Sequence, residues 1–134
     1  MNPNKIKHLE FIQNVISRMN SNSFHIKAWA VTLAAALFAV AAKDGYSKYS
    51  LIVYYVIPIF WGLDGFFLST ERKYLALYDE VRMKDEGQID FNMDVSEFCK
   101  ENRTWLSGVF SKTLLPFYGI IFAANIVIMW LLEV

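Results

Sequence analysis

The residue with the clearest capacity for chemistry is Asp64, because its carboxyl group interrupts an otherwise uncharged apolar run from Leu51 to Leu68. A carboxylate within a membrane span costs roughly 3 kcal/mol on insertion scales, so it usually has a partner and faces protein or water. Lys27 and Lys112 flank the two other apolar runs at the same expected level, and either could reach it. Asp64 is therefore expected either to fix helix packing through an ion pair or to line an ion path.

Two neutral polar residues, Thr32 and Asn125, also lie inside apolar runs. A polar side chain in a span can hydrogen bond across a helix interface or face the water of a pore. Both roles stay open here. Thr32 and Asn125 therefore join Asp64, Lys27 and Lys112 as candidate pore or interhelical polar contacts.

Small residues recur in the first two apolar runs at spacings of three or four, which places them on one face of a helix and lets helix backbones approach closely. They are Ala30, Ala34, Ala35, Ala39, Gly62, Gly65 and Ser69. Three spans cannot bury all of these faces within one chain. The pattern predicts a homo-oligomer held partly by these residues.

Two patterns suggest an active or metal site, and neither is complete. Gly62 to Gly65 resembles the glycine-aspartate signature of intramembrane aspartyl proteases, but those enzymes need a second membrane aspartate, and no other apolar run contains one. Residues 90–101 overlap a calcium-loop pattern that ends at Glu101, yet Val95 stands where the sharp turn needs glycine. An enzyme, a cofactor and a metal are not expected.

The elements that must position these residues are three apolar runs, 24–42, 51–69 and 113–132. A helix rises about 1.5 Å per residue, so each run is long enough to cross a hydrocarbon core of about 30 Å. The alternatives, a soluble protein with buried core helices or a cleaved signal peptide ending near Ala41, fit these lengths less well. The predicted fold class is an all-α membrane protein with three transmembrane helices, whose first partner is the lipid bilayer.

Composition narrows the class further. The chain is 55% apolar and carries 13 Lys and Arg against 13 Asp and Glu, which excludes a disordered chain and argues against a nucleic-acid binder driven by bulk charge. Its single cysteine, Cys99, and its two histidines leave no ligand set for structural zinc. Function must therefore come from the membrane segments and the parts attached to them.

The segments outside the apolar runs are also predicted to be helical. Residues 5–20 place apolar side chains at three- and four-residue spacing, which indicates an amphipathic helix. This helix would pack on protein or lie on the inner leaflet. The first span would begin separately, with Asn22 or Ser23 as its N-cap. Residues 70–104 are predicted to form a cytoplasmic helical hairpin. Its return helix would begin at the capping box of Asp94 and Glu97 and would continue to a kink at Pro116.

Orientation follows from the positive-inside rule. Eleven Lys and Arg lie in or beside the N-terminal segment and the loop between the second and third runs, and two lie in the short loop between the first and second. The N-terminus and the hairpin are expected in the cytoplasm, and the C-terminus outside. The hairpin offers a candidate face for a cytoplasmic protein or signalling ligand, made of Glu71, Arg72, Tyr78 and Arg82.

A resemblance adds a biological setting. The run Phe60 to Leu68, followed by Glu71-Arg72 and Leu77 to Arg82, and the earlier run Arg18 to Phe24, resemble a group of small bacterial inner-membrane proteins. The layout is similar in outline to SLATT-type few-span effectors, which are thought to oligomerise and perturb membranes in antiphage and nucleotide-signalling systems. The resemblance implies a bacterial inner-membrane location and an effector role, and it supplies no catalytic or ligand residue.

Two functions fit these patterns. One is a non-enzymatic oligomeric membrane protein that forms or gates a pore or perturbs the membrane, in the manner of an antiphage defence effector. The other is a membrane-anchored scaffold whose cytoplasmic hairpin docks another protein. A pore requires Asp64, Asn125 or Thr32 to face a common axis, whereas a scaffold would bury them between helices.

Overall fold

The computed structural model describes residues 2–44, 48–100 and 103–133. Its elements are α1 (Pro3–Asp44), α2 (Lys48–Arg82), the short 3₁₀ helices η1 (Glu86–Gln88) and η2 (Ser96–Phe98), α3 (Trp105–Val109) and α4 (Leu114–Glu133). No strand occurs among the described residues. The prediction of an all-helical chain is confirmed.

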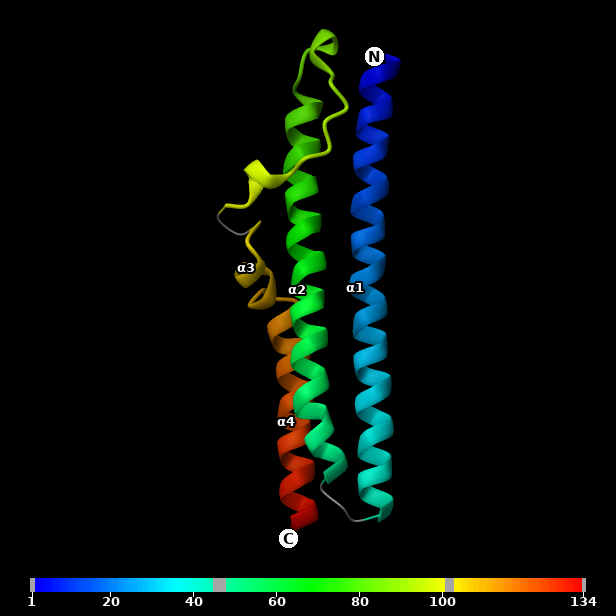
Figure 1. Cartoon of the computed structure of the whole chain (residues 1–134), viewed down its shortest axis with the longest axis vertical. Coiled ribbons are helices and arrows are strands. Elements are labelled where there is room, and N and C mark those ends of the chain that lie inside the picture. The colour runs from blue at the N-terminus through cyan, green and yellow to red at the C-terminus, as the bar shows by residue number, and fades with distance from the viewer. Residues whose placement is uncertain (1, 45–47, 101–102, 134) are drawn as a thin grey trace.

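Three of these helices, α1, α2 and α4, are long and apolar enough to cross a membrane. Figure 1 shows α1 and α2 side by side and antiparallel, with α4 along the N-terminal half of α2. The N-terminus lies at one end of the bundle and the C-terminus at the other (Figure 1). The arrangement is consistent with a multi-pass membrane protein.

The N-terminal segment and the first apolar run form one uninterrupted helix, α1. The expected boundary after residue 20, with a cap at Asn22 or Ser23, is therefore wrong. Asn and Ser favour caps because their side chains hydrogen bond to nearby backbone, but this local preference is weak against packing along a second long helix. Ser23 instead directs its hydroxyl to Asp64 on α2.

Beyond the apolar runs, α1 and α2 continue together as a two-helix stalk, defined here as residues 3–22 and 70–82. Its core consists of Ile12 from α1 and of Leu77 and Val81 from α2, all buried. The apolar stripe of the N-terminal segment thus packs on protein. Of the two placements considered for an amphipathic helix, this one shields the middle of the stripe without requiring contact with lipid, while Ile6 at its start stays 49% exposed.

The chain returns along the stalk without the α-helix that was expected between 94 and 104. Within the described part of residues 83–104, the helical residues are in short 3₁₀ segments that include η1 and η2, and none is in an α-helix. Asp90, Asn92 and Asp94 each accept a hydrogen bond from the backbone N–H two residues later, at 3.1, 3.0 and 2.9 Å. These local bonds compete with helix formation, so the predicted hairpin is a helix followed by a mostly irregular return segment.

Contacts with both stalk helices hold the return segment in place. The His8 ring lies 3.0 Å from the carbonyl oxygen of Asn92, and the Tyr74 hydroxyl donates to the carbonyl of Met93 at 3.1 Å. The neighbouring residue, Phe91, has a left-handed φ of 54°, which is uncommon for an aromatic side chain. The return segment is therefore packed against the stalk, although it lacks regular structure.

Near the apolar runs the chain forms α3, breaks, and starts α4 at Leu114. The hydroxyl oxygen of Ser111 accepts a hydrogen bond from the Leu114 N–H at 3.1 Å, as a helix cap does. Pro116 then lies in the first turn of α4, directly after the Leu115 N–H that bonds to the Ser111 carbonyl, and it removes only the next bond of the series. The expected kink at Pro116 is instead the beginning of a separate helix.

Candidate functional site: a buried polar cluster

A polar cluster lies between α1, α2 and α4, with the fully buried carboxylate of Asp64 at its centre. Asp64 Oδ2 accepts hydrogen bonds from Lys27 Nζ at 2.6 Å and from the Tyr118 hydroxyl at 2.9 Å. Asp64 Oδ1 accepts one from the Ser23 hydroxyl. Each of the three apolar helices thus contributes a polar side chain to one site.

The helical repeat explains how α1 supplies two of these groups. Ser23 and Lys27 are four residues apart, which places them one above the other on the face toward α2. Lys27 Nζ also donates to the Ser23 hydroxyl oxygen at 2.7 Å. Lys27 therefore bridges Ser23 and Asp64, and the two α1 side chains hold one another in position.

The cluster adjoins an apolar core through Tyr118, which belongs to both. This core is shared by α1, α2 and α4, and its buried residues are Ala30, Ala34, Val53, Ile57, Leu114, Tyr118 and Ile121. The indole ring of Trp61 stacks on the Tyr118 ring with centroids 5.7 Å apart. Because such surroundings screen charge poorly, the attraction between Lys27 and Asp64 is stronger here than it would be in water.

The cluster is chemically suited to holding helices together. A Ser-Lys pair acts as a nucleophile only when a neutral amine can take the hydroxyl proton. Here the Lys27 ammonium is engaged in an ion pair with Asp64, and the Ser23 hydroxyl donates its proton toward the same carboxylate. The three donors therefore compensate the buried charge of the Asp64 carboxylate.

The other candidate polar residues of the spans are placed apart from the cluster. Lys112, the alternative partner for Asp64, is exposed. Thr32 is exposed as well, and its hydroxyl donates to the carbonyl of Ala28 at 2.8 Å. Asn125 is fully buried on α4. Of the two expected partners, the structure pairs Asp64 with Lys27.

The small residues are divided between the inside and the outside of the bundle. Ala30 and Ala34 are buried in the core of the chain itself, whereas Ala35 and Ala39 are exposed. Gly65 and Ser69 are buried, and the Ser69 hydroxyl donates to the carbonyl of Phe66. Contacts within one chain therefore account for part of this pattern, and the exposed alanines stay available for a second copy.

Two glycines allow α3 to lie directly on α2. A Cβ atom added to Gly65 would come within 2.5 Å of Val109 Cγ2, and one added to Gly108 within 2.6 Å of the Gly65 carbonyl oxygen. Trp61 Nε1 donates to the Val109 carbonyl at 2.7 Å, and Trp105 Nε1 to the Gly62 carbonyl at 2.9 Å. These contacts fix α3 beside the polar cluster.

The four residues expected to form a cytoplasmic partner face differ in how far they are exposed to solvent. Arg82 is exposed and lies 3.6 Å from Asp79, while Glu71, Arg72 and Tyr78 are half-buried. Tyr78 packs at the edge of the stalk core, and Arg72 Nη1 lies 3.5 Å from the Ser107 hydroxyl. Part of this set therefore holds the stalk and α3 together.

Two acidic residues of the calcium-like pattern, Asp90 and Asp94, accept hydrogen bonds from the backbone. The N–H of Asn92 donates to Asp90, and this bond lowers the pKa of the Asp90 carboxyl below its ordinary value. The N–H of Ser96 lowers the pKa of Asp94 in the same way. Glu101, which would complete the pattern, lies outside the described residues.

Sequence reasoning identified two members of the cluster, Asp64 and Lys27, and missed two. Ser23 was interpreted as a helix cap, although its four-residue spacing from Lys27 could have revealed it. Tyr118 gave no such signal, because a tyrosine within an apolar run is common near membrane interfaces. Comparison with known protein families, characterised proteins and solved structures finds no match to this chain.

Proposed function

We propose that the protein is a non-enzymatic membrane anchor whose stalk docks a partner protein on the cytoplasmic side. The observation that carries this proposal is the continuity of the helices. α1 has 42 residues and α2 has 35. At about 1.5 Å per residue they are about 63 and 52 Å long, well beyond a hydrocarbon core of about 30 Å.

The polar cluster supports the same proposal, because it lies where the stalk joins the spans. Asp64 and Lys27 fix the register of α2 against α1 at that level, and Tyr118 ties α4 to them. Because the stalk is the continuation of α1 and α2, these contacts also set how its two helices lie against one another. The stalk can therefore present its surface in a defined position above the membrane.

The charge distribution supports a cytoplasmic stalk. Eleven of the 13 Lys and Arg lie in or beside the N-terminal segment, the stalk part of α2 and the segment between α2 and α4, and the positive-inside rule assigns that side to the cytoplasm. The stalk surface carries both charges and apolar side chains, including exposed Leu75 and the pair Asp79 and Arg82. Both kinds of side chain are therefore accessible to a partner at this face of the stalk.

Site-specific photocrosslinking in cells tests the docking proposal. A photoreactive amino acid at Leu75 or Arg82 is expected to form an adduct with a protein other than the chain itself. The matched control is Ile120, an exposed apolar residue of α4 that would face lipid. If the stalk positions yield no more protein adduct than Ile120 does, the docking proposal is wrong.

A pore in a homo-oligomer is the second candidate, and one observation favours it. An open groove between α1 and α4 is lined by Lys27, Thr32, Phe24, Ala28, Val31 and Phe117. With Ala35 and Ala39 exposed on α1, a second copy packed there would bring Thr32 toward a shared interface. This is the activity that the resemblance to SLATT-type effectors implies.

The enclosed carboxylate of Asp64 gives the pore less support than the docking role, because it already accepts three hydrogen bonds within one chain. Ion flux into liposomes distinguishes the two functions. A pore predicts flux that rises with the amount of assembled oligomer and that changes in Thr32→Val. A docking protein predicts no flux above that of empty liposomes.

A further inference from the structure

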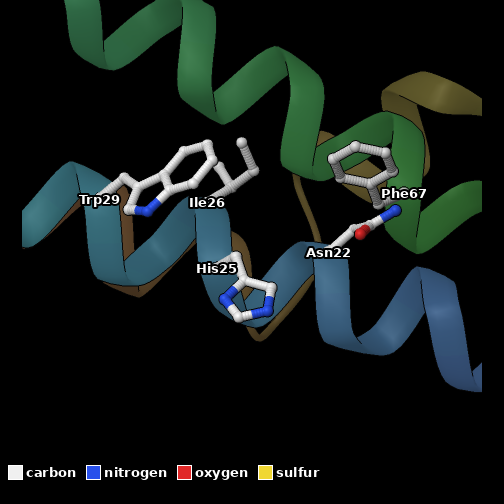
Figure 2. Close-up of a pocket in the computed structure, with 5 residues that line it drawn as sticks. All are labelled: Asn22, His25, Ile26, Trp29 and Phe67. Carbon is white, nitrogen blue, oxygen red and sulfur yellow. The ribbon is translucent and has the colours of Figure 1, made fainter.

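An open groove with a volume of about 330 Å³ lies between α1 and α2, on the surface of the bundle. It is lined by Asn22, His25, Ile26 and Trp29 of α1 and by Phe67 of α2, as Figure 2 shows. The groove contains none of the side chains of the Asp64 cluster. It therefore has no role in the ion pair described above.

The groove lies at the level where the stalk joins the spans. On α1, its lining residues 22 to 29 include the turn that holds Ser23 and Lys27, and on α2, Phe67 comes three residues after Asp64. Trp29 is 60% exposed although it lies in the apolar part of α1. Tryptophan in such a position is typical of the boundary between hydrocarbon and headgroups.

One face of α1 changes in polarity from Arg18, one turn beyond the stalk end of the groove, through the groove to Trp29. Arg18, Asn22, His25 and Trp29 follow one another at spacings of four, three and four residues, which places them in a single stripe. Arg18 and His25 are both exposed. The stripe thus runs from a guanidinium at the stalk end, through an amide and an imidazole, to an indole at the membrane end.

This gradient matches the chemistry of a phospholipid. A phosphate forms strong, geometrically matched hydrogen bonds with a guanidinium, and an acyl chain fills an apolar slot such as that between Ile26, Trp29 and Phe67. We propose that the groove holds one phospholipid of the surrounding bilayer and prefers an anionic headgroup. The proposal is independent of whether the stalk docks a partner or the chain forms a pore.

Native mass spectrometry tests the proposal with two probes that share the same acyl chains, phosphatidylglycerol and phosphatidylcholine. The full chain, purified in mild detergent, is expected to retain phosphatidylglycerol at least about tenfold better, which is the ratio that a difference of about 1.4 kcal/mol produces. The double variant Arg18→Gln/His25→Gln is expected to lose this preference. Trp29→Ala is expected to retain less of both lipids, because it removes one wall of the slot.

The matched control is Trp130→Ala, which removes an exposed tryptophan from the far end of α4. Its lipid retention is expected to equal that of the unmodified chain. Thermal unfolding of each variant shows that the bundle is intact, since Arg18, His25 and Trp29 are all exposed. Equal retention of the two lipids by the unmodified chain, or equal losses in Trp29→Ala and Trp130→Ala, would overturn the proposal.

Discussion

The Nζ atom of Lys27 lies 2.6 Å from Oδ2 of Asp64, and the Asp64 side chain is completely buried while that of Lys27 is 20% exposed. The pair joins α1 to α2 where the stalk meets the apolar part of the bundle. A buried pair of this kind need not add net stability, because removing both charges from water is costly. Replacing only one of the two side chains is costly as well, since an uncompensated charge is then left inside the bundle.

The hydrogen bond from Tyr118 to Asp64 can be tested without changing any charge. Tyr118→Phe removes one donor from a buried carboxylate, so the free energy of unfolding is expected to fall by about 1.5–3 kcal/mol. The control is Tyr55→Phe, because the Tyr55 side chain is 77% exposed. Thermal unfolding in detergent measures both variants. Equal effects would show that the Tyr118 hydroxyl contributes nothing specific.

The close contact between α2 and α3 can be tested with a substitution at Gly65. Gly65→Ala would place a methyl group against Val109, including 3.2 Å from its backbone nitrogen, so α3 is expected to detach or shift. Overpacking of this size destabilises by about 1–3 kcal/mol. Gly119→Ala is the control, since a Cβ there meets nothing within 4 Å.

Detachment of α3 would expose the half-buried Trp61 and would free the indole nitrogen of Trp105, because both indoles bond across this contact. Quenching of tryptophan fluorescence by a water-soluble quencher is therefore expected to increase in Gly65→Ala and to stay unchanged in Gly119→Ala. A Gly65→Ala protein with unchanged quenching and unchanged stability would contradict the packing described for α3.

The return segment is expected to loosen in acid. The pKa values of Asp90 and Asp94 are lowered in the folded chain by backbone N–H donors, so these carboxylates stabilise the segment above their unfolded pKa of about 3.9. That stabilisation is lost as pH falls through the lower folded values. Hydrogen exchange of residues 90–96 is expected to accelerate as pH falls through this range, after correction for intrinsic rates.

Asp90→Asn/Asp94→Asn keeps an oxygen acceptor at each turn and removes the titrating group. Its exchange is expected to vary less with pH than that of the unmodified chain. A double variant with the same acid response would show that other groups control the segment.

Topology can be tested with the single cysteine. Cys99 is exposed in the return segment, and the positive-inside rule assigns that segment to the cytoplasm. An impermeant thiol reagent is expected to label Cys99 in inverted vesicles and to leave it unlabelled in intact cells. Labelling in intact cells would reverse the assigned orientation.

The sequence was sufficient for the apolar helices and insufficient for the segments between them. Length and hydropathy determine a span almost alone, and the three predicted runs coincide with parts of α1, α2 and α4. The boundary at Ser23 and the helix after Asp94 were both argued from local capping preferences. In the structure, packing against α2 keeps α1 helical through Ser23. Successive turns at Asp90, Asn92 and Asp94 take the place of the helix expected after Asp94.

The candidate site was predictable where charge was involved. A lone carboxylate in an apolar run requires compensation, which made Asp64 conspicuous and made a lysine at the same level its natural partner. The contributions of Ser23 and Tyr118 depend on how three helices rotate about their axes. Hydropathy carries no information on that rotation, so these two donors become evident only in the folded chain.

The central structural claim is that Asp64 and Lys27 hold α1 and α2 together through their ion pair. Unfolding free energies of Lys27→Met, Asp64→Leu and the double variant test it directly. Lys27→Met is expected to cost about 3–5 kcal/mol because it leaves the buried Asp64 carboxylate uncompensated, and the double change is expected to recover most of that loss. Asp64→Leu is expected to cost less, because the Lys27 side chain is 20% exposed and keeps contact with water. Singles without effect, or a double variant as unstable as the sum of the singles, would contradict the claim.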